Sequence, residues 1–142
     1  MMLRASYQKG IYLYYEGQLK GAKTILESFK DSVMEEDNNW MAEKEHCLFV
    51  LASIEKAEGH KNKAIDGFEL YVSLFKNKEE AEKRLLEAYW HLSQLFMLSD
   101  KTEGALTYLD LVINNSTVVE EPYLMLNAYK EKAKYLFERN EY

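Results

Sequence analysis

Residues 52–64 read ASIEKAEGHKNKA, and the outline of this stretch recurs on either side of it. In each copy a small residue is followed twelve positions later by an alanine. The alanines are 42 and 41 residues apart, and a period of about 20 to 50 residues is typical of stacked repeats. The sequence therefore predicts a solenoid rather than a globule with a single core. The pairs are Gly10 and Ala22, Ala52 and Ala64, and Ser93 and Ala105, with Ala133 opening a fourth.

Each repeat reads as two antiparallel helices joined by a short turn. Small residues allow the two helices to cross closely, because the interaxial distance depends on the side chains at the contact. Glycine and asparagine suit the end of a helix, and Asp100 is expected to cap the helix that follows it. The equivalent turns are Glu16-Gly17-Gln18, Glu58-Gly59-His60, Ser99-Asp100-Lys101 and Arg139-Asn140-Glu141.

Large apolar residues follow each alanine at positions i+4 and i+7, which places them on one buried helical face. These residues are Leu26 and Phe29, Phe68 and Tyr71, and Leu109 and Val112. The pattern predicts seven helices and no convincing strand. The first helices of the units are expected at 3–16, 40–58, 79–98 and 120–139, and the second helices at 18–35, 61–76 and 102–115.

These residues resemble the tetratricopeptide repeat (TPR) family, over essentially the whole chain. One copy of its motif matches Tyr89, Leu92, Ser93, Phe96, Ala105 and Leu109, and another matches Leu48, Leu51, Ala52, Gly59, Ala64 and Phe68. Lys9 and Lys132 stand where the family has leucine, Glu55 replaces an aromatic residue, and the proline that ends each repeat is missing. The longer period is similar to kinesin light chains, bacterial peptide-sensing regulators and response-regulator phosphatases. Other solenoids of helix pairs with periods near 40 residues stay open.

The resemblance implies an all-α, right-handed superhelix of about seven antiparallel helices, arranged as three pairs and a final helix. We expect one repeat domain over 1–142, with units near 3–35, 40–76 and 79–115 and a terminal helix at 120–139. The last helix has no partner in the sequence, and Tyr135 and Phe137 would leave apolar surface for a following helix. The chain is therefore expected to be a segment of a longer protein, although a helix that caps the solenoid is the alternative.

In the family, the first helices line a concave face, and the resemblance transfers fourteen positions to this chain. Aromatic side chains with polar neighbours are typical of interface hot spots, and Lys56, Lys130 and Lys134 could hold a carboxylate. Burial between helices is the competing interpretation for each aromatic residue, and Tyr71, Tyr89, Tyr108 and Tyr129 are assigned to packing. The predicted partner-binding residues are Tyr7, Ile11, Tyr14, Tyr15, His46, Phe49, Ser53, Lys56, Trp90, Gln94, Met97, Asn127, Lys130 and Lys134.

Composition argues against several classes of function. With 24 acidic and 18 basic residues the net charge is −6, which disfavours a nucleic-acid partner because phosphate binding needs a basic face. No apolar stretch is long enough for a membrane span and no signal peptide is visible. The single cysteine, Cys47, favours a reducing compartment and a cytoplasmic location.

No catalytic, cofactor or metal motif stands out. Glu43 and His46 have a spacing used in di-iron bundles, but the second copy and the further carboxylates that such a site needs are missing. The sequence contains no phosphate-binding glycine loop and no serine elbow. We therefore expect no enzyme activity, no cofactor and no metal.

Three hypotheses of function follow. The first is a non-catalytic scaffold that binds a protein or peptide segment with its concave face. The alternative is a peptide-responsive regulatory or sensor module of a larger signalling or transcription protein. The third is association of copies into a homo-oligomer through the uncapped C-terminal end.

Overall fold

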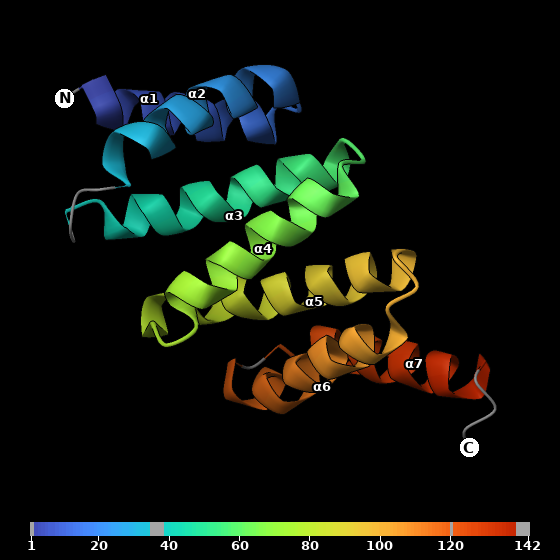
Figure 1. The fold of residues 1–142 in the computed structure, drawn as a ribbon. Helices are drawn as coiled ribbons and strands as arrows, with labels where there is room; N and C mark the ends of the chain where they lie inside the picture. Colours follow the sequence, from blue (N-terminus) through green and yellow to red (C-terminus); the bar gives the residue numbers. More distant parts are fainter. Residues whose placement is uncertain (1, 35–38, 120, 139–142) are drawn as a thin grey trace. The chain divides into compact units, whose positions relative to one another are not determined.

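A computed structural model describes residues 2–34, 39–119 and 121–138 (Figure 1). These residues contain seven α-helices, one 3-10 turn and no strand, so the predicted all-α fold of helix pairs is confirmed. The predicted helix ends at 35, 120 and 139 and the turn at 139–141 lie outside the described residues. The helices are α1 (Met2–Tyr15), α2 (Leu19–Val33), α3 (Met41–Ala57), α4 (Lys61–Phe75), α5 (Glu82–Leu98), α6 (Thr102–Val119) and α7 (Pro122–Glu138), and the 3-10 turn η1 (Glu79–Ala81) precedes α5.

The chain divides into two compact units, Met1–Tyr71 and Val72–Tyr142, and each is described by itself. In the first unit, α2 packs against α1 and α3, and α1 also contacts α3. In the second unit, α6 packs against α5 and α7. The expectation of a single repeat domain over 1–142 stays a prediction.

The buried stripe of the second helices is as the spacing predicts. Leu26 and Phe29 are fully buried in the first unit, where they pack with Val33 and with the α3 residues Val50 and Ile54. Burial of these apolar side chains provides the main driving force for docking α2 on α3. The other predicted members of the stripe, Phe68, Tyr71, Leu109 and Val112, are each at most 1% exposed.

Small residues lie where helices approach most closely. A Cβ atom added at Gly10 on α1 would lie 2.6 Å from the Leu26 side chain, and one added at Gly67 on α4 would lie 2.9 Å from the Cβ atom of Ala52. Real Cβ atoms essentially never come this close to another atom, so a larger residue would require a neighbour to shift. Gly10 and Ala52 therefore lie at close approaches between helices, but Gly10 meets Leu26 and Ala52 meets Gly67, where the sequence pattern pairs them with Ala22 and Ala64.

The turn inside each helix pair is the same structure three times. At the second turn Gly59 has a φ of 81°, and the N–H of His60 donates to the carbonyl oxygen of Glu55 at 2.9 Å. This six-to-one bond with a left-handed residue defines a Schellman ending, which satisfies a carbonyl at the helix terminus. Equivalent bonds at 2.9 Å join Gln18 to Leu13 and Lys101 to Phe96.

The expectation that Asp100 caps the following helix is wrong. Asp100 has a φ of 58° and occupies the left-handed position that Gly17 and Gly59 occupy in the other turns. Aspartate adopts this conformation more readily than most residues, since its short polar side chain can bond locally. It therefore ends α5 rather than opening α6, which begins at Thr102.

Aromatic packing organises the second unit around α5 and α6. The ring of Tyr108 stacks on Tyr89 at 6.0 Å and meets Phe96 edge-on at 5.3 Å. On α7, Lys132 stands where the TPR pattern has leucine, and its Nζ atom is 2.7 Å from Oδ1 of Asp110. The packing role expected for Tyr71 and Tyr89 agrees with their burial, whereas Tyr129 is 53% exposed.

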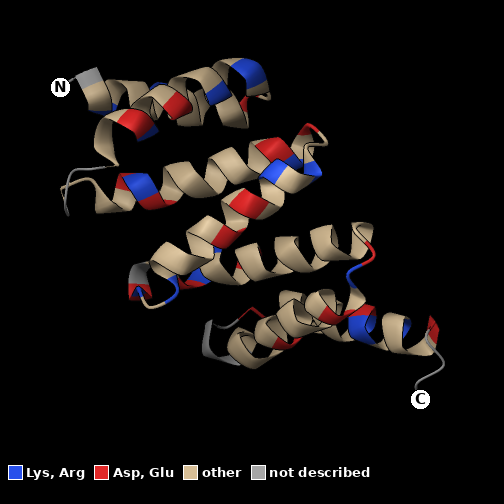
Figure 2. Cartoon of the chain, viewed as in Figure 1, with Lys and Arg blue, Asp and Glu red and all other residues tan. Residues whose placement is uncertain are grey.

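Charged residues are distributed over many helices. In the view of Figure 2, lysine and arginine are scattered among acidic residues rather than gathered on one element. Among the described residues, no helix combines the length and the apolar character that a membrane span requires.

Candidate functional site

The predicted binding residues of α1 are mostly engaged in packing. Tyr7, Ile11 and Tyr14 are partly buried and pack against the core of the first unit. The hydroxyl group of Tyr7 and Nδ1 of His46 are 2.7 Å apart, so the structure brings these two predicted residues together. Tyr15, in contrast, is 71% exposed and is the clearest candidate for contact with a partner.

The predicted residues of α3 form a half-buried strip. The ring of Phe49 lies 5.6 Å from Phe68 and 5.5 Å from Tyr71, so it belongs to the packing between α3 and α4. The hydroxyl group of Ser53 donates to the carbonyl oxygen of Phe49 at 2.9 Å. Burial lowers the pKa of Lys56 below its ordinary value of 10.5, because desolvation penalises the charged form.

The predicted residues of the second unit fall into two groups by exposure. Trp90, Gln94 and Met97 on α5 are half-buried, and the three predicted residues of α7 are exposed. The exposed residues are Asn127, Lys130 and Lys134.

Glu43 and His46, which have the di-iron spacing on α3, each contact a residue of α1. Glu43 pairs with Arg4, with Oε2 3.5 Å from the guanidinium group. His46 bonds with Tyr7. The two side chains therefore serve different partners on α1.

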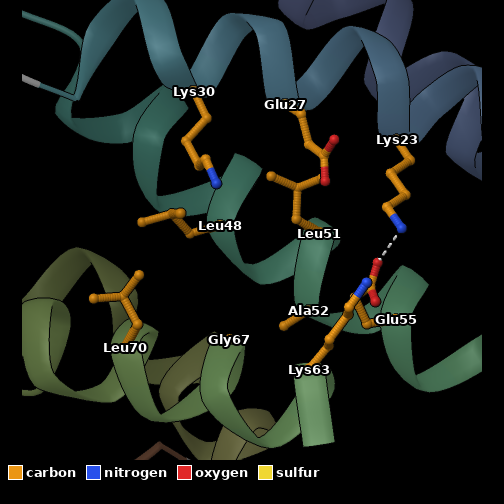
Figure 3. Close-up of a pocket in the computed structure, with 10 residues that line it drawn as sticks. All are labelled: Lys23, Glu27, Lys30, Leu48, Leu51, Ala52, Glu55, Lys63, Gly67 and Leu70. Carbon is orange, nitrogen blue, oxygen red and sulfur yellow. Dashed lines mark ion pairs between the residues drawn. The ribbon is translucent and has the colours of Figure 1, made fainter. Parts of the chain in front are cut away.

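A groove that the sequence analysis did not identify lies in the first unit, on the side of α3 where α2 and α4 flank it (Figure 3). Its volume is about 270 Å³. Apolar side chains of α3 form its floor, charged side chains of α2 form one wall, and Lys63, Gly67 and Leu70 of α4 form the other. The lining residues are Lys23, Glu27 and Lys30 from α2, Leu48, Leu51, Ala52 and Glu55 from α3, and Lys63, Gly67 and Leu70 from α4.

One end of this groove holds an ionic cluster around Glu55. Nζ of Lys23 is 2.6 Å from Oε1 of Glu55, and Nδ1 of His60 is 3.0 Å from Oε2 of the same carboxylate. Burial of Glu55 opposes its ionisation, but hydrogen bonds from Lys23 and His60 outweigh that effect and lower its pKa below 4.5. The bond to Glu55 likewise raises the pKa of Lys23. Each partner therefore favours the charged form of the other.

Glu55, Glu58 and His60 could also offer ligand atoms to a metal ion. One donor atom from each lies within 4.8 Å of the others. The ammonium group of Lys23 already neutralises Glu55 and lies 3.9 Å from Oε1 of Glu58. A divalent cation would have to displace that lysine, so the cluster fits an ion-pair network better than a metal centre.

A comparison of the repeats with one another could have located the groove from the sequence. Equivalent positions in neighbouring repeats are 42 or 41 residues apart. At the positions equivalent to the three groove lysines, the other repeats have apolar residues or glycine. Glu55 likewise corresponds to Leu13 and Phe96. Lys23 corresponds to Ile65 and Leu106, Lys30 to Val72 and Ile113, and Lys63 to Gly21 and Gly104.

The helix pairs, close contacts at small residues and repeated turns define a TPR-like helical-repeat fold. Neither the family models nor the curated proteins with which the sequence was compared include a match. Solved structures do resemble the chain. Their sequence identities to it are low, so the likeness concerns the fold alone.

The kinesin light chain TPR-like repeats of Podosopora anserina are 17% identical, with a TM-score of 0.71 over 99% of this chain and 68% of that one. A variant of the same protein gives 18% identity and a TM-score of 0.72. PcrH, solved in complex with the chaperone binding region of PopB, is 13% identical, with a TM-score of 0.69 over 91% of this chain and 93% of that one.

Proposed function

We propose that this chain is a non-catalytic scaffold that binds a protein or peptide segment through the face predicted on α1, α3, α5 and α7. The observation that carries the proposal is the likeness to PcrH, a helical-repeat protein whose structure holds the chaperone binding region of PopB. A fold by itself does not specify a function. The proposal therefore also depends on the side chains that this face presents.

Those side chains have the mixed character of a protein interface. Tyr15 exposes an aromatic ring in the first unit, and an exposed tyrosine can bury a large area while its hydroxyl group stays hydrogen-bonded. Lys130 and Lys134 are exposed in the second unit and can pair with carboxylates of a partner, which aids association and specificity more than affinity.

The test is site-specific photo-crosslinking in lysate from the source organism. Benzoylphenylalanine replaces Tyr15 in one variant and Lys130 in another, and adducts are identified by mass spectrometry. Lys9, exposed on another side of the same helix as Tyr15, and Thr107, exposed on α6, provide matched control positions. We expect the same protein in the adducts of both test positions and of neither control.

Adducts of equal yield at Lys9 and Tyr15 would contradict the proposed face. Exposed positions are used for the crosslinker because truncation of Tyr14 or Phe49 would disturb packing as well as binding. The sensor module, the homo-oligomer, the absence of catalysis, the cytoplasmic location and the longer parent protein stay predictions from the sequence.

A further inference from the structure

The groove between α2 and α4 offers a second surface, separate from the predicted binding face. His46, Phe49, Ser53 and Lys56 belong to that face, and the groove is lined by other α3 residues. Its floor consists of Leu48, Leu51 and Ala52.

An apolar side chain of a ligand would find apolar contacts in the middle of the groove. Gly67 contributes no side chain there, and Leu70 forms part of the α4 wall with 43% of its surface exposed. Covering such surface removes apolar area from water, which favours binding. Figure 3 shows Leu48 and Leu51 of α3 between the charged side chains of α2 and Leu70 of α4.

The charges of the groove favour an acidic ligand. Lys30 and Lys63 lie at opposite ends, one on the α2 wall and one on the α4 wall (Figure 3). Within the described residues neither forms an ion pair, whereas Lys23 is neutralised by Glu55. Three lysines and two glutamates line the groove, so the lining residues carry one excess positive charge on a chain whose net charge is −6.

The three groove lysines have no lysine counterpart at the equivalent positions of the other repeats. Isoleucine, leucine, valine or glycine stands at their positions in the other repeats. The other helix pairs form without a lysine at these positions. Folding of a helix pair therefore does not require Lys30 or Lys63 to be lysine. Fixed charges that flank an apolar floor are suited to recognise a ligand of opposite charge.

We propose that this groove binds an acidic peptide segment, in which a leucine-sized apolar side chain occupies the floor and flanking carboxylates pair with Lys30 and Lys63. A basic segment would be repelled at both ends. A neutral segment would leave the two lysines without counter-charges, while a segment without the apolar residue would leave the floor solvated.

The proposal is tested by NMR titration of the ¹⁵N-labelled chain with the acetylated peptide Glu-Glu-Leu-Leu-Glu-Glu. We expect shifts of the amides of Leu48, Leu51 and Gly67, and weaker binding at high salt because surface charges are screened. The comparison peptides replace every glutamate by glutamine or both leucines by serine. Each should bind more weakly than the parent peptide.

Charge reversal gives the second arm of the test. The double variant Lys30→Glu and Lys63→Glu should weaken binding of the acidic peptide by about tenfold. Lys9→Glu with Lys20→Glu changes the net charge equally at exposed positions of α1 and α2 outside the groove, and it should bind like the natural sequence. Circular dichroism at 222 nm checks that both variants fold.

Three results would overturn the proposal. The glutamine peptide could bind as tightly as the acidic one, or the shifted amides could lie away from α2, α3 and α4. Shifts at the groove that depend on protein concentration in the absence of peptide would identify a second copy of the chain as the occupant. None of these results bears on crosslinking at Tyr15 or Lys130, so the two proposals fail independently.

Discussion

Glu55 in the first unit and Phe96 in the second occupy the same place in two repeats, yet their surroundings differ in kind. Each carbonyl oxygen accepts the turn-closing bond at 2.9 Å, from His60 in one case and Lys101 in the other. The carboxylate of Glu55 is held by Lys23 and His60. The ring of Phe96 packs on Tyr108, with the ammonium group of Lys101 5.7 Å from its centroid.

The comparison shows that the backbone of the turn does not depend on the chemistry of this side chain. The residue eight positions after this side chain does differ between the two repeats. A Cβ atom at Gly104 would lie 2.6 Å from the Phe96 ring, so glycine makes room for the aromatic residue. Beside Glu55 the equivalent residue is Lys63, which lines the groove.

The largest expected effect comes from truncating the aromatic member of the comparison. Phe96→Ala should reduce the free energy of unfolding by about 3 kcal/mol, because a half-buried ring loses its contact with Tyr108 and leaves space behind. Glu55→Ala should cost less, about 1 kcal/mol, because Lys23 and His60, the partners of this buried carboxylate, keep contact with water and can be solvated without it. Urea unfolding followed at 222 nm measures both. Equal costs would show that the ionic cluster stabilises its repeat as much as the aromatic packing does.

A smaller effect is expected at the left-handed residues of the turns. No atom lies within 4 Å of a Cβ atom added at Gly59, so Gly59→Ala should cost about 1 kcal/mol through backbone strain alone. Asp100→Gly should stabilise the chain by about 0.5 kcal/mol, because it relieves that strain. Thermal and urea unfolding measure the two shifts, with Gly17→Ala as the matched control. A loss of stability in Asp100→Gly would mean that the aspartate side chain makes a necessary contact.

The smallest effect is the dependence of stability on pH at Glu55. Its folded pKa lies below the ordinary value of 4.5, so its ionised form stabilises the fold above that value and this contribution disappears as the pH falls through the folded pKa. The difference in unfolding free energy between the natural chain and Glu55→Gln should therefore shrink between about pH 6 and about pH 3. A difference that grows on acidification would contradict the lowered pKa.

The helices and their buried faces could be predicted because the spacing of apolar residues along the sequence follows the helical period. Leu26 and Phe29 lie one turn apart on a face that must be covered, and the structure buries both. The turn at Asp100 was misread because aspartate is common both at helix starts and in left-handed positions, and the local sequence does not separate the two.

The groove was harder to predict because its lining comes from three helices. Lys30 and Lys63 lie 33 positions apart in the sequence, and the geometry of packing between helices decides that they line the same space. Tyr7 and Phe49 illustrate the opposite difficulty. Each lies on a first helix at a position transferred from the TPR pattern, and each also packs on a neighbouring helix.

The three Schellman turns have a consequence for the kinetics of folding. Each is closed by a bond between residues five positions apart, so its formation requires no distant segment of the chain. Contacts of such short sequence separation lose little loop entropy and are associated with fast folding. In a repeat array a helix pair can form at any of these turns and propagate to its neighbours. The chain therefore has several starting points for folding, each specified by its own local sequence.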